Sequence, residues 1–526
     1  MWVTLTVVAV TSYLIYFFTK RPNEFWKKYG VPQFQTSFKD NLSILFGIKS
    51  HMDVDDVTYK LLQSKDEKYC GFVDMAGPTV LVRDLDILKK VLIKDFDYFV
   101  DRRQFFSSKK EPLFQKMIGS LLGEEWKGVR SSVSPTFTTG KIRRMMENFN
   151  RVGNNWISHL KSESKNGSFK INANEEITHL TVDVIAASVF GMNANTIQDP
   201  KSIFSQMCHR LSDFNFVRTV KIIFSMNFPW LTDLIGMEVM DGVSLRFFEK
   251  IMSQGVKSRM SGEEKRNDFI QLIVEARKGE LKGVGSDELS TFEKEAQLAD
   301  ETTRKKNYLE DDTIAHAQLI AFFFAGFTTT SSIITFATYA LAAHQEVQEK
   351  LRVELETKLF KNGDEKDIDY DELNKLPYLD MFLSEVHRKF PPLGRLERKC
   401  VKEYHDPESG LRVPKDGLVV APLLSLHNDP QYFEHPDKFY PEHFNPENKA
   451  KRNPYSYMPF GMGPRNCMGM RFALVQTKSA IARLVYNFHL ETTPNTPLPM
   501  RAKTMGFAIQ PPDNLELKLT PRRKSN

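Results

Sequence analysis

Apolar positions along the chain predict long helices, with strand-like runs confined to one short region. Residues 140–275 read as successive helices. Two runs with the length and composition of strands, Tyr69–Asp74 and Thr79–Val82, flank a turn at residues 76–78. The second run leads into an amphipathic helix over residues 85–93. The pattern therefore predicts a small β region that feeds a set of helices.

The longest helical run covers residues 314–343, and two aspartates precede it where carboxylates favour the helix dipole. Residues 319–343 carry no charge, so a membrane span is one interpretation. Two features favour a buried core helix instead. Residues 328–332 all carry hydroxyl groups, which are costly in lipid. A span here would also put the candidate site residues described below on opposite sides of a membrane.

The first residues predict a membrane anchor. Trp2–Phe18 is uncharged and mostly apolar, and Lys20 and Arg21 follow. A helix of this length measures about 25 Å, which suits a thin bilayer such as that of the endoplasmic reticulum. The alternative, a cleaved signal peptide, lacks a charged leading region and a small-residue cleavage site. We expect residues 1–21 to be a transmembrane signal anchor and residues 22–526 to form one cytoplasmic domain.

Two other stretches are candidates for contact with the membrane surface. Residues 25–32, with Trp26 and Tyr29, read as a stiff amphipathic linker. Residues 222–231 are apolar and interrupted by Pro229. They belong either to the core or to an exposed patch that dips into lipid beside the anchor.

Composition indicates a globular protein in a reducing compartment. The 526 residues are 41% hydrophobic and 26% charged, as in a globular chain with a large core, and the 40 phenylalanines predict an aromatic interior or pocket. The net charge of +6 is too diffuse to indicate nucleic-acid binding. Four widely spaced cysteines show no paired spacing, which indicates a reducing compartment rather than a disulfide framework.

One cysteine lies on a Gly- and Pro-rich loop, residues 460–469, ahead of an apolar helix. Glycines let the backbone turn tightly and approach a flat ligand, and amides at the helix start favour a thiolate. A lone thiolate suits the axial position of a haem iron and suits zinc poorly, because zinc prefers four clustered ligands. By itself, Cys467 would favour the interpretation as a buried structural cysteine, because a free cysteine is usually a small buried apolar residue.

This loop resembles the haem-binding signature of the cytochrome P-450 family. Phe460, Gly463, Cys467 and Gly469 fill its pattern, and Arg465 lies where the family has a basic residue for a haem propionate. The resemblance implies haem b, iron protoporphyrin IX, as cofactor, with the Cys467 thiolate as the axial metal ligand.

Three more basic or aromatic residues match family positions at the haem propionates. Trp126 and Arg130 are four apart in a helical setting, so they share a face. Without the cysteine loop, an exposed arginine stacked on its own helix's tryptophan would be the better interpretation. Arg398 matches a further basic position. The resemblance implies that all three bind the cofactor.

Residues 325–330 resemble the family's oxygen-activation segment, and Thr329 matches the family threonine. Glycine and adjacent hydroxyls can open a helix locally. A hydroxyl over the iron can hold a water that delivers protons. The family usually has Asp or Glu before that threonine, whereas this chain has Thr328. Because a hydroxyl supplies no carboxyl proton, we expect slower oxygen activation or an acid from elsewhere.

Glu385 and Arg388 are three apart on a helix, so they can form a generic ion pair. The resemblance instead implies a buried structural network beneath the haem, closed by a later arginine. This chain has His443 there, which keeps a donor but loses the guanidinium fork and its permanent charge. We expect a weaker or pH-sensitive triad.

The motifs occur in family order over nearly the whole chain after the anchor, and residues 248–273 resemble the microsomal animal branch that handles drugs and insecticides. The implied fold is the cytochrome P-450 fold: mainly α with a small β region, as one catalytic domain. The implied function is a haem-thiolate monooxygenase that inserts one oxygen atom from O2 into lipophilic xenobiotics or endogenous lipids.

The resemblance also implies partners and a substrate pocket. Electrons would come from NADPH through a membrane-bound flavoprotein reductase, with cytochrome b5 as a further candidate. A basic patch could help the reductase to dock, although charged runs are more often solvated faces. The patch consists of Lys127, Lys141, Arg143 and Arg144. Family positions suggest the following pocket residues, each of which also fits simple core packing: Phe105, Phe106, Phe214, Phe216, Phe322, Ala325 and Leu393.

Two alternatives stay open. One is a reductase-independent haem-thiolate isomerase or dehydratase of lipid peroxides, which the missing acid at Thr328 favours and Thr329 disfavours. The other is a non-catalytic, membrane-tethered haem or lipid binder.

Overall fold

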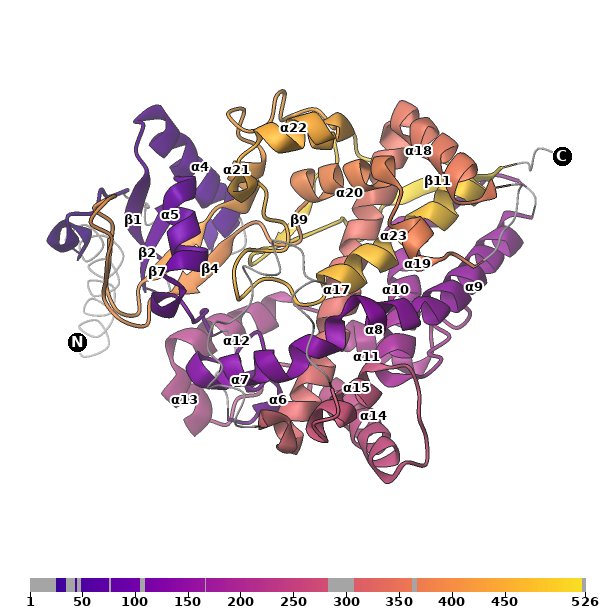
Figure 1. Ribbon diagram of the computed structural model, residues 1–526, viewed down its shortest axis with the longest axis horizontal. Helices are drawn as coiled ribbons and strands as arrows, with labels where there is room; N and C mark the ends of the chain where they lie inside the picture. The colour runs from indigo at the N-terminus through magenta and orange to yellow at the C-terminus, as the bar shows by residue number, and fades with distance from the viewer. Residues whose placement is uncertain are drawn as a thin grey trace, which may run out of the picture.

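The structure is a computed structural model that describes residues 25–34, 43–44, 49–74, 77–104, 109–165, 167–281, 307–361 and 367–522. Within these ranges most of the chain is helical, with small sheets, as the sequence predicts (Figure 1). The expected anchor, residues 1–21, lies outside the described residues.

The helices run from the N-terminal sheet region to the C-terminal core. Their bounds are α4 His51–Ser64, α5 Leu85–Lys89, α6 Pro112–Gln115, α7 Gly123–Val133, α8 Thr139–Arg144, α9 Met146–Ser164, α10 Ala173–Phe190, α11 Ile203–Ser212, α12 Phe216–Asn227, α13 Pro229–Leu234, α14 Gly242–Ser261, α15 Phe269–Arg277, α17 Asp312–Ala343, α18 Gln345–Lys358, α19 Tyr370–Leu373, α20 Pro377–Lys389, α21 Leu423–His427, α22 Pro446–Lys451 and α23 Met470–Asn487.

The strands form four small sheets, with the orders β1-β2-β7-β4, β3-β11-β8, β10-β9 and β5-β6. Their bounds are β1 Tyr69–Asp74, β2 Gly77–Val82, β3 Phe169–Asn172, β4 Leu396–Lys399, β5 Tyr404–His405, β6 Arg412–Val413, β7 Leu418–Ala421, β8 Phe488–Thr492, β9 Lys503–Met505, β10 Ala508–Gln510 and β11 Glu516–Pro521.

The two strands predicted from the sequence form an antiparallel hairpin, with Tyr69 opposite Val82. β2 also pairs in parallel with β7, so that Thr79 lies opposite Leu418. Figure 1 shows these C-terminal strands, in orange, beside the indigo N-terminal ones. The sheet thus brings the two ends of the domain together, a pairing that no local pattern indicates.

Helix α17 runs through the centre of the helical part. Asp311 caps it by accepting hydrogen bonds from the main-chain N–H groups of Thr313 and Ile314, at 2.8 and 3.2 Å. Among the described helices it alone is long and apolar enough to cross a membrane, yet 72% of its most apolar window is buried in the protein. Helices α10, α14, α20 and α23 pack around it. It is therefore the core helix that the sequence favours.

Residues 26–29 form a short 3-10 helix that packs into the protein. Trp26 is fully buried, and its indole N–H donates to the Phe72 carbonyl at 2.8 Å. A side chain on Gly71 would meet the Trp26 ring at 2.5 Å. The expectation that Trp26 lies against a membrane surface is therefore wrong, because the small sheet region offers a closer apolar contact.

Candidate functional site

The loop before α23 folds tightly because of its glycines. Gly461 and Gly463 both have left-handed backbone angles, with φ of 73° and 70°. A Cβ atom on Gly463 would lie 1.9 Å from the Leu92 carbonyl oxygen, so only glycine fits there. The N–H of Cys467 donates to the Phe460 carbonyl at 2.8 Å and closes the turn. The loop thereby fixes the cysteine just ahead of the helix.

The Cys467 side chain is solvent-accessible, unlike the three other free cysteines, which are buried. Protein nevertheless surrounds it so densely that desolvation raises the pKa of its thiol. The N–H of Gly469 and the charges of Arg130 and Arg102 lower this pKa, but by less than desolvation raises it. The thiol is therefore accessible to a ligand while most of its surroundings are protein. Because burial outweighs the amide, the helix start alone does not produce a thiolate, and a bound metal ion would have to ionise the sulfur.

One face of α17 is also accessible although the helix lies in the core. Ala325 and Thr329, one turn apart, are exposed, while Phe323, Phe327 and Thr330 around them are buried. Side chains four residues apart share a helix face, so these two residues form one accessible face in the middle of α17.

The helix stays continuous through this segment, contrary to the local opening considered from the sequence. The Thr329 hydroxyl donates to the Ala325 carbonyl at 2.7 Å, and the Thr328 hydroxyl donates to Phe324 at 2.8 Å. A side chain on Gly326 would meet Ile185 at 2.4 Å. The glycine thus serves close packing of α17 on α10 instead of a break in the helix.

Four arginines surround the cysteine loop. Burial lowers the pKa of Arg102 and Arg398, lowers that of Arg130 to about 10 and lowers that of Arg465 to about 8. They also repel one another, since Arg102 lowers the pKa of each of the other three.

The partners of three of these arginines are mainly neutral oxygens. Arg130 donates to the main chain and side chain of Asn466, at 3.0 and 2.6 Å. Arg102 donates to the Arg465 carbonyl at 2.6 Å. Arg398 donates to the Glu397 and Met462 carbonyls, and its buried Nε has no hydrogen-bond partner within the described part of the chain. Desolvated cations with so little counter-charge are costly unless an anion joins them.

Arg465 has a different environment. Its guanidinium donates to the carbonyls of Val100, Ile118 and Leu121, at 2.8, 3.3 and 2.8 Å, and lies 4.0 Å over the Trp126 ring. All three of its nitrogens are therefore engaged with the chain. In the structure Arg465 and Trp126 fasten the cysteine loop to the segment before α7, and their contact with a cofactor remains a prediction.

These features together fit haem. An accessible thiol, an accessible small residue and hydroxyl on α17, and four cations around the cysteine loop whose charge two propionates would balance are groups that suit haem binding. Across the described residues there is no group of three or more His, Cys, Asp or Glu side chains able to hold a metal ion.

Comparison with known proteins decides the family. The family model described as Cytochrome P450 matches residues 41–519. The chain is a cytochrome P450. It is 31% identical to cytochrome P450 9e2 of Blattella germanica over 96% of each chain. It is also 32% identical to cytochrome P450 3A11 of Mus musculus, over 99% of this P450 and 97% of the mouse protein. Cytochrome P450 6j1 of Blattella germanica is 31% identical over 98% of each chain.

Membership gives the reaction class and the cofactor. The protein is a haem-thiolate monooxygenase, as the sequence predicts. When bound, haem supplies the iron that activates dioxygen, with a cysteine thiolate as axial ligand. In this P450, Cys467 is the residue suited to hold that iron, and Arg102, Arg130 and Arg398 are the residues suited to hold the propionates. Thr329 presents a hydroxyl that can orient a water molecule by hydrogen bonding.

Glu385, Arg388 and His443 form one buried network. Arg388 makes two parallel hydrogen bonds to the Glu385 carboxylate, at 2.8 and 2.7 Å, and both residues are fully buried. His443 Nδ1 lies 3.2 Å from the same carboxylate. Burial opposes ionisation of Glu385, but the bonds from Arg388 and His443 outweigh it and lower the pKa. The structure thus brings the three residues together as the resemblance implies.

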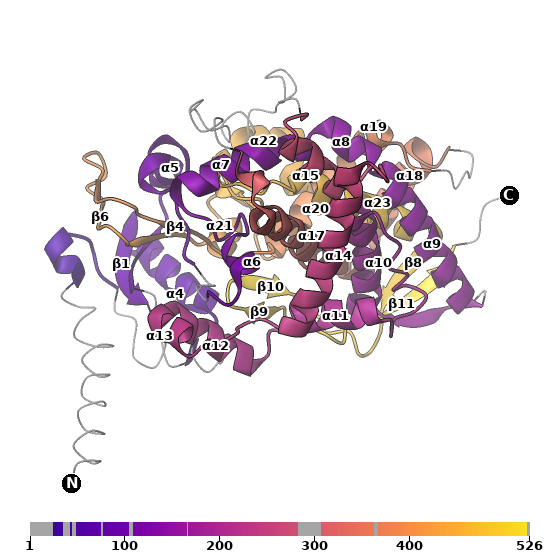
Figure 2. The same ribbon diagram turned by 90° about the horizontal axis from the view of Figure 1, so that it is seen from below.

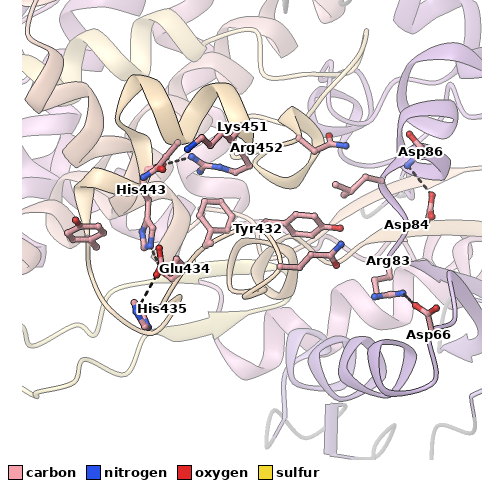
Figure 3. Close-up of a pocket in the computed structure, with 16 residues that line it drawn as sticks. Asp66, Arg83, Asp84, Asp86, Tyr432, Glu434, His435, His443, Lys451 and Arg452 are labelled. Atoms are coloured by element: carbon pink, nitrogen blue, oxygen red, sulfur yellow. Dashed lines mark hydrogen bonds and ion pairs between the residues drawn. The ribbon is translucent and has the colours of Figure 1, made fainter.

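Another arginine lies beside His443. Arg452 donates to the His443 carbonyl (Figure 3). Its guanidinium lies 4.4 Å over the Phe433 ring and 4.6 Å over the Phe444 ring. His443 and Arg452 line a surface pocket of about 670 Å³ whose other walls include both acids and bases, such as Asp84 and Arg83. Arg452 therefore adds a cation next to the position where the family usually has one.

The predicted substrate-pocket residues separate in the structure. Ala325 lies on the accessible face of α17, and Leu393 is 42% exposed and forms a bridge to Ala508. Phe322 instead packs edge-on against Phe137, with ring centres 4.9 Å apart. Phe214 borders a different pocket, described below. Phe105 and Phe106 lie outside the described residues, as does the side chain of Phe216.

Sequence reasoning missed Arg102, whose charge acts on Cys467 as that of Arg130 does. The signal was weak, because adjacent arginines at 102 and 103 are as common on surfaces as at sites. Only the fold shows that Arg102 turns toward the cysteine loop, whereas Arg103 pairs with Glu397 at 3.1 Å.

Proposed function

We propose that this P450 inserts one oxygen atom from O2 into lipophilic small molecules, xenobiotics or endogenous lipids, with electrons from NADPH delivered by a flavoprotein reductase. The observation that carries the proposal is the pairing of an accessible Cys467 thiol with accessible Ala325 and Thr329 inside the core. We propose that these groups open into one hollow, with the sulfur on one side and α17 on the other.

Each residue then has one task. Cys467 binds iron. The N–H of Gly469 donates to the Cys467 sulfur and stabilises the negative charge of the thiolate. Arg102, Arg130 and Arg398 neutralise the propionates. Ala325 leaves room for substrate, and Thr329 holds a water by a hydroxyl that can turn away from the Ala325 carbonyl.

An apolar patch supports a lipid-facing orientation and a membrane-partitioning substrate. Large apolar side chains are exposed on α12, α13 and their ends: Val217, Val220, Phe228, Trp230, Leu234 and Ile235. Single exposed apolar residues are ordinary, but a cluster on two consecutive helices indicates an interaction surface. Figure 2 shows α12 and α13 on one edge of the molecule. We propose that this edge dips into the endoplasmic reticulum membrane beside an anchor formed by residues 1–21.

The reductase, with cytochrome b5 as a further electron donor, would dock on the cysteine side. The predicted basic patch is largely neutralised there: Lys127 lies 3.0 Å from Glu124, Lys141 lies 3.2 Å from Glu275, and Arg143 lies 2.7 Å from Asp371. Residues paired in this way add little net field, so any contribution of the patch to docking is expected mainly from Arg144, which is exposed.

The accessible Thr329 favours monooxygenation over the isomerase alternative, because a peroxide substrate brings its own O–O bond and needs no proton delivery to dioxygen. The experiment is expression with a reductase, followed by a screen of lipophilic compounds for spectral shifts and NADPH-dependent products. Products that appear with peroxides and without NADPH would instead support the isomerase. Haem binding without turnover of any compound would support the non-catalytic binder.

A further inference from the structure

A second pocket lies behind α17, on a different face from Thr329. It has a volume of about 680 Å³ and is bordered by α10, α11, α17 and the hairpin of β9 and β10, which Figure 2 shows along one side of α17. We call it the rear pocket. Three residues of α17 with hydroxyl groups line this pocket: Thr328, Ser331 and Ser332. From α10, Thr178 adds a hydroxyl and His179 adds an imidazole. Polar walls and this volume suit a group of water molecules.

Thr328 and Thr329 lie on different faces of α17. Successive residues of a helix point about 100° apart. Thr329 shares the accessible face of Ala325, whereas Thr328 shares the rear pocket with Ser331, whose hydroxyl lies 2.9 Å from that of Thr178. Thr328 therefore lines the rear pocket and is also the residue directly before Thr329 in the chain.

His179 is a buried side chain aimed into this pocket. It is only 6% exposed and lines the pocket. Its position is fixed through the main chain, where its carbonyl accepts a bond from Thr196 at 3.1 Å. Burial lowers the pKa of His179, Glu175 opposes this, and His209 and His159 lower the pKa further. A neutral imidazole accepts a proton at one nitrogen and releases one from the other, which suits a relay.

We propose that His179 and water in the rear pocket supply protons to the Thr328 hydroxyl, in place of the carboxylate that this chain lacks next to Thr329. The inference rests on the proposed function. In this relay the His179 imidazole gives a proton to a pocket water, that water gives one to the Thr328 hydroxyl, and Thr328 gives one through water to the Thr329 hydroxyl. The imidazole regains a proton from pocket water at its other nitrogen, so no charge accumulates. His179 acts through Thr328 and does not touch the reacting atoms, so it is a positioning residue.

The mouth of the pocket carries other titratable groups. His209 and Asp213 come from the α11 side, while Lys503 and Asp513, which form an ion pair, come from the hairpin side. Arg210 also borders the pocket and pairs with Asp241 at 2.8 Å. These groups are largely solvent-exposed, whereas His179 lies deep in the pocket. The test must therefore separate the buried histidine from the exposed one.

The test compares His179→Gln with the matched control His209→Gln in the haem-loaded enzyme with reductase. We expect His179→Gln to lower product formed per NADPH by at least about threefold, to raise hydrogen peroxide release and to increase the solvent deuterium isotope effect. His209→Gln should leave all three unchanged. A carboxylate supplied by Thr328→Glu should restore the coupling of His179→Gln. Equal coupling in wild type and His179→Gln would overturn the proposal.

A second readout does not depend on turnover. A crystal structure of the purified protein should show ordered waters within hydrogen-bond distance of both the His179 ring and the Thr328 hydroxyl, and a rear pocket without such waters would overturn the proposal. Failure of the proposed function is distinguishable. Loss of the haem-thiolate spectrum in the wild type contradicts that function, whereas a normal spectrum with unchanged coupling contradicts only the relay.

Discussion

At the residue scale, the most informative position is His443, where the chain departs from its family. Its Nδ1 faces the Glu385 carboxylate at 3.2 Å, and its Nε2 faces the Glu434 carbonyl at 2.5 Å. Both partners only accept hydrogen bonds, whereas a neutral imidazole has a single N–H donor. A side chain with permanent donors would supply both contacts.

We expect His443→Arg to preserve or raise haem retention, because a guanidinium keeps its donors and its charge. His443→Ala should lower retention and cost about 1–3 kcal/mol, since it removes one of the two hydrogen-bond partners of a buried carboxylate oxygen and leaves only Arg388. Haem content after gel filtration, compared across the two variants and wild type, measures the effect. A large loss in His443→Arg would show that this position has another role.

Gly463 tests the geometry of the cysteine loop. Gly463→Ala should destabilise the protein by more than about 3 kcal/mol, because alanine is strained at φ +70° and its Cβ would meet the Leu92 carbonyl at 1.9 Å. Gly469→Ala is the matched control, since its nearest contact is Phe137 at an ordinary 3.9 Å. Soluble yield and thermal midpoint compare the two. Equal behaviour of both variants would contradict the described loop.

At the element scale, α20 and α21 bring two neutral histidines under the cysteine loop. Burial lowers the pKa of His387 to about 4 and that of His427 to about 3. His427 Nε2 accepts from the Met458 N–H at 3.1 Å, and the His387 ring lies 5.1 Å from Phe460. These contacts connect the helix of the Glu385 network to the loop that holds Cys467.

Both histidines make stability depend on pH. The unfolded chain binds protons below about pH 6.5 while the folded histidines stay neutral, so the free energy of unfolding falls as pH decreases, by up to about 1.4 kcal/mol per pH unit for each histidine. The loss continues toward pH 4 for His387 and pH 3 for His427. His427→Gln should reduce the slope between pH 6.5 and 5, measured by chemical denaturation. An unchanged slope would exclude His427 as a source.

At the scale of the whole molecule, the exposed apolar patch of α12 and α13 should set how the protein sits on a membrane. Trp230 is 67% exposed in this patch, whereas Trp26 is fully buried. Burying an aromatic side chain in lipid removes apolar area from water, so the patch stabilises one orientation.

We expect Trp230 to be quenched by brominated phospholipids when the full-length protein is reconstituted in vesicles. Trp230→Phe should remove a quenched component of the emission, because that ring lies in lipid. Trp26→Phe should remove only unquenched emission, since its ring lies inside the protein. If Trp230→Phe left the quenched fraction unchanged, the patch would face another partner or water.

The sequence predicted those features that local chemistry specifies. The cysteine loop, α17 and the β1–β2 hairpin each depend on residues close together in the chain, such as the Asp311 cap. The rest depends on pairs far apart. β7 joins β2, Trp26 packs on Gly71, and Arg102 turns toward the cysteine loop only once the fold exists. No periodicity or motif encodes those contacts.

The haem-thiolate assignment of Cys467 is tested most directly by the reduced carbon monoxide difference spectrum of purified wild type and Cys467→Ser. We predict the thiolate-type absorption of cysteine-ligated haem in the wild type and its complete loss in Cys467→Ser. Cys400→Ser, which changes a buried cysteine elsewhere in the fold, should keep the absorption. The same spectrum in wild type and Cys467→Ser would contradict the assignment of Cys467 and the site built around it.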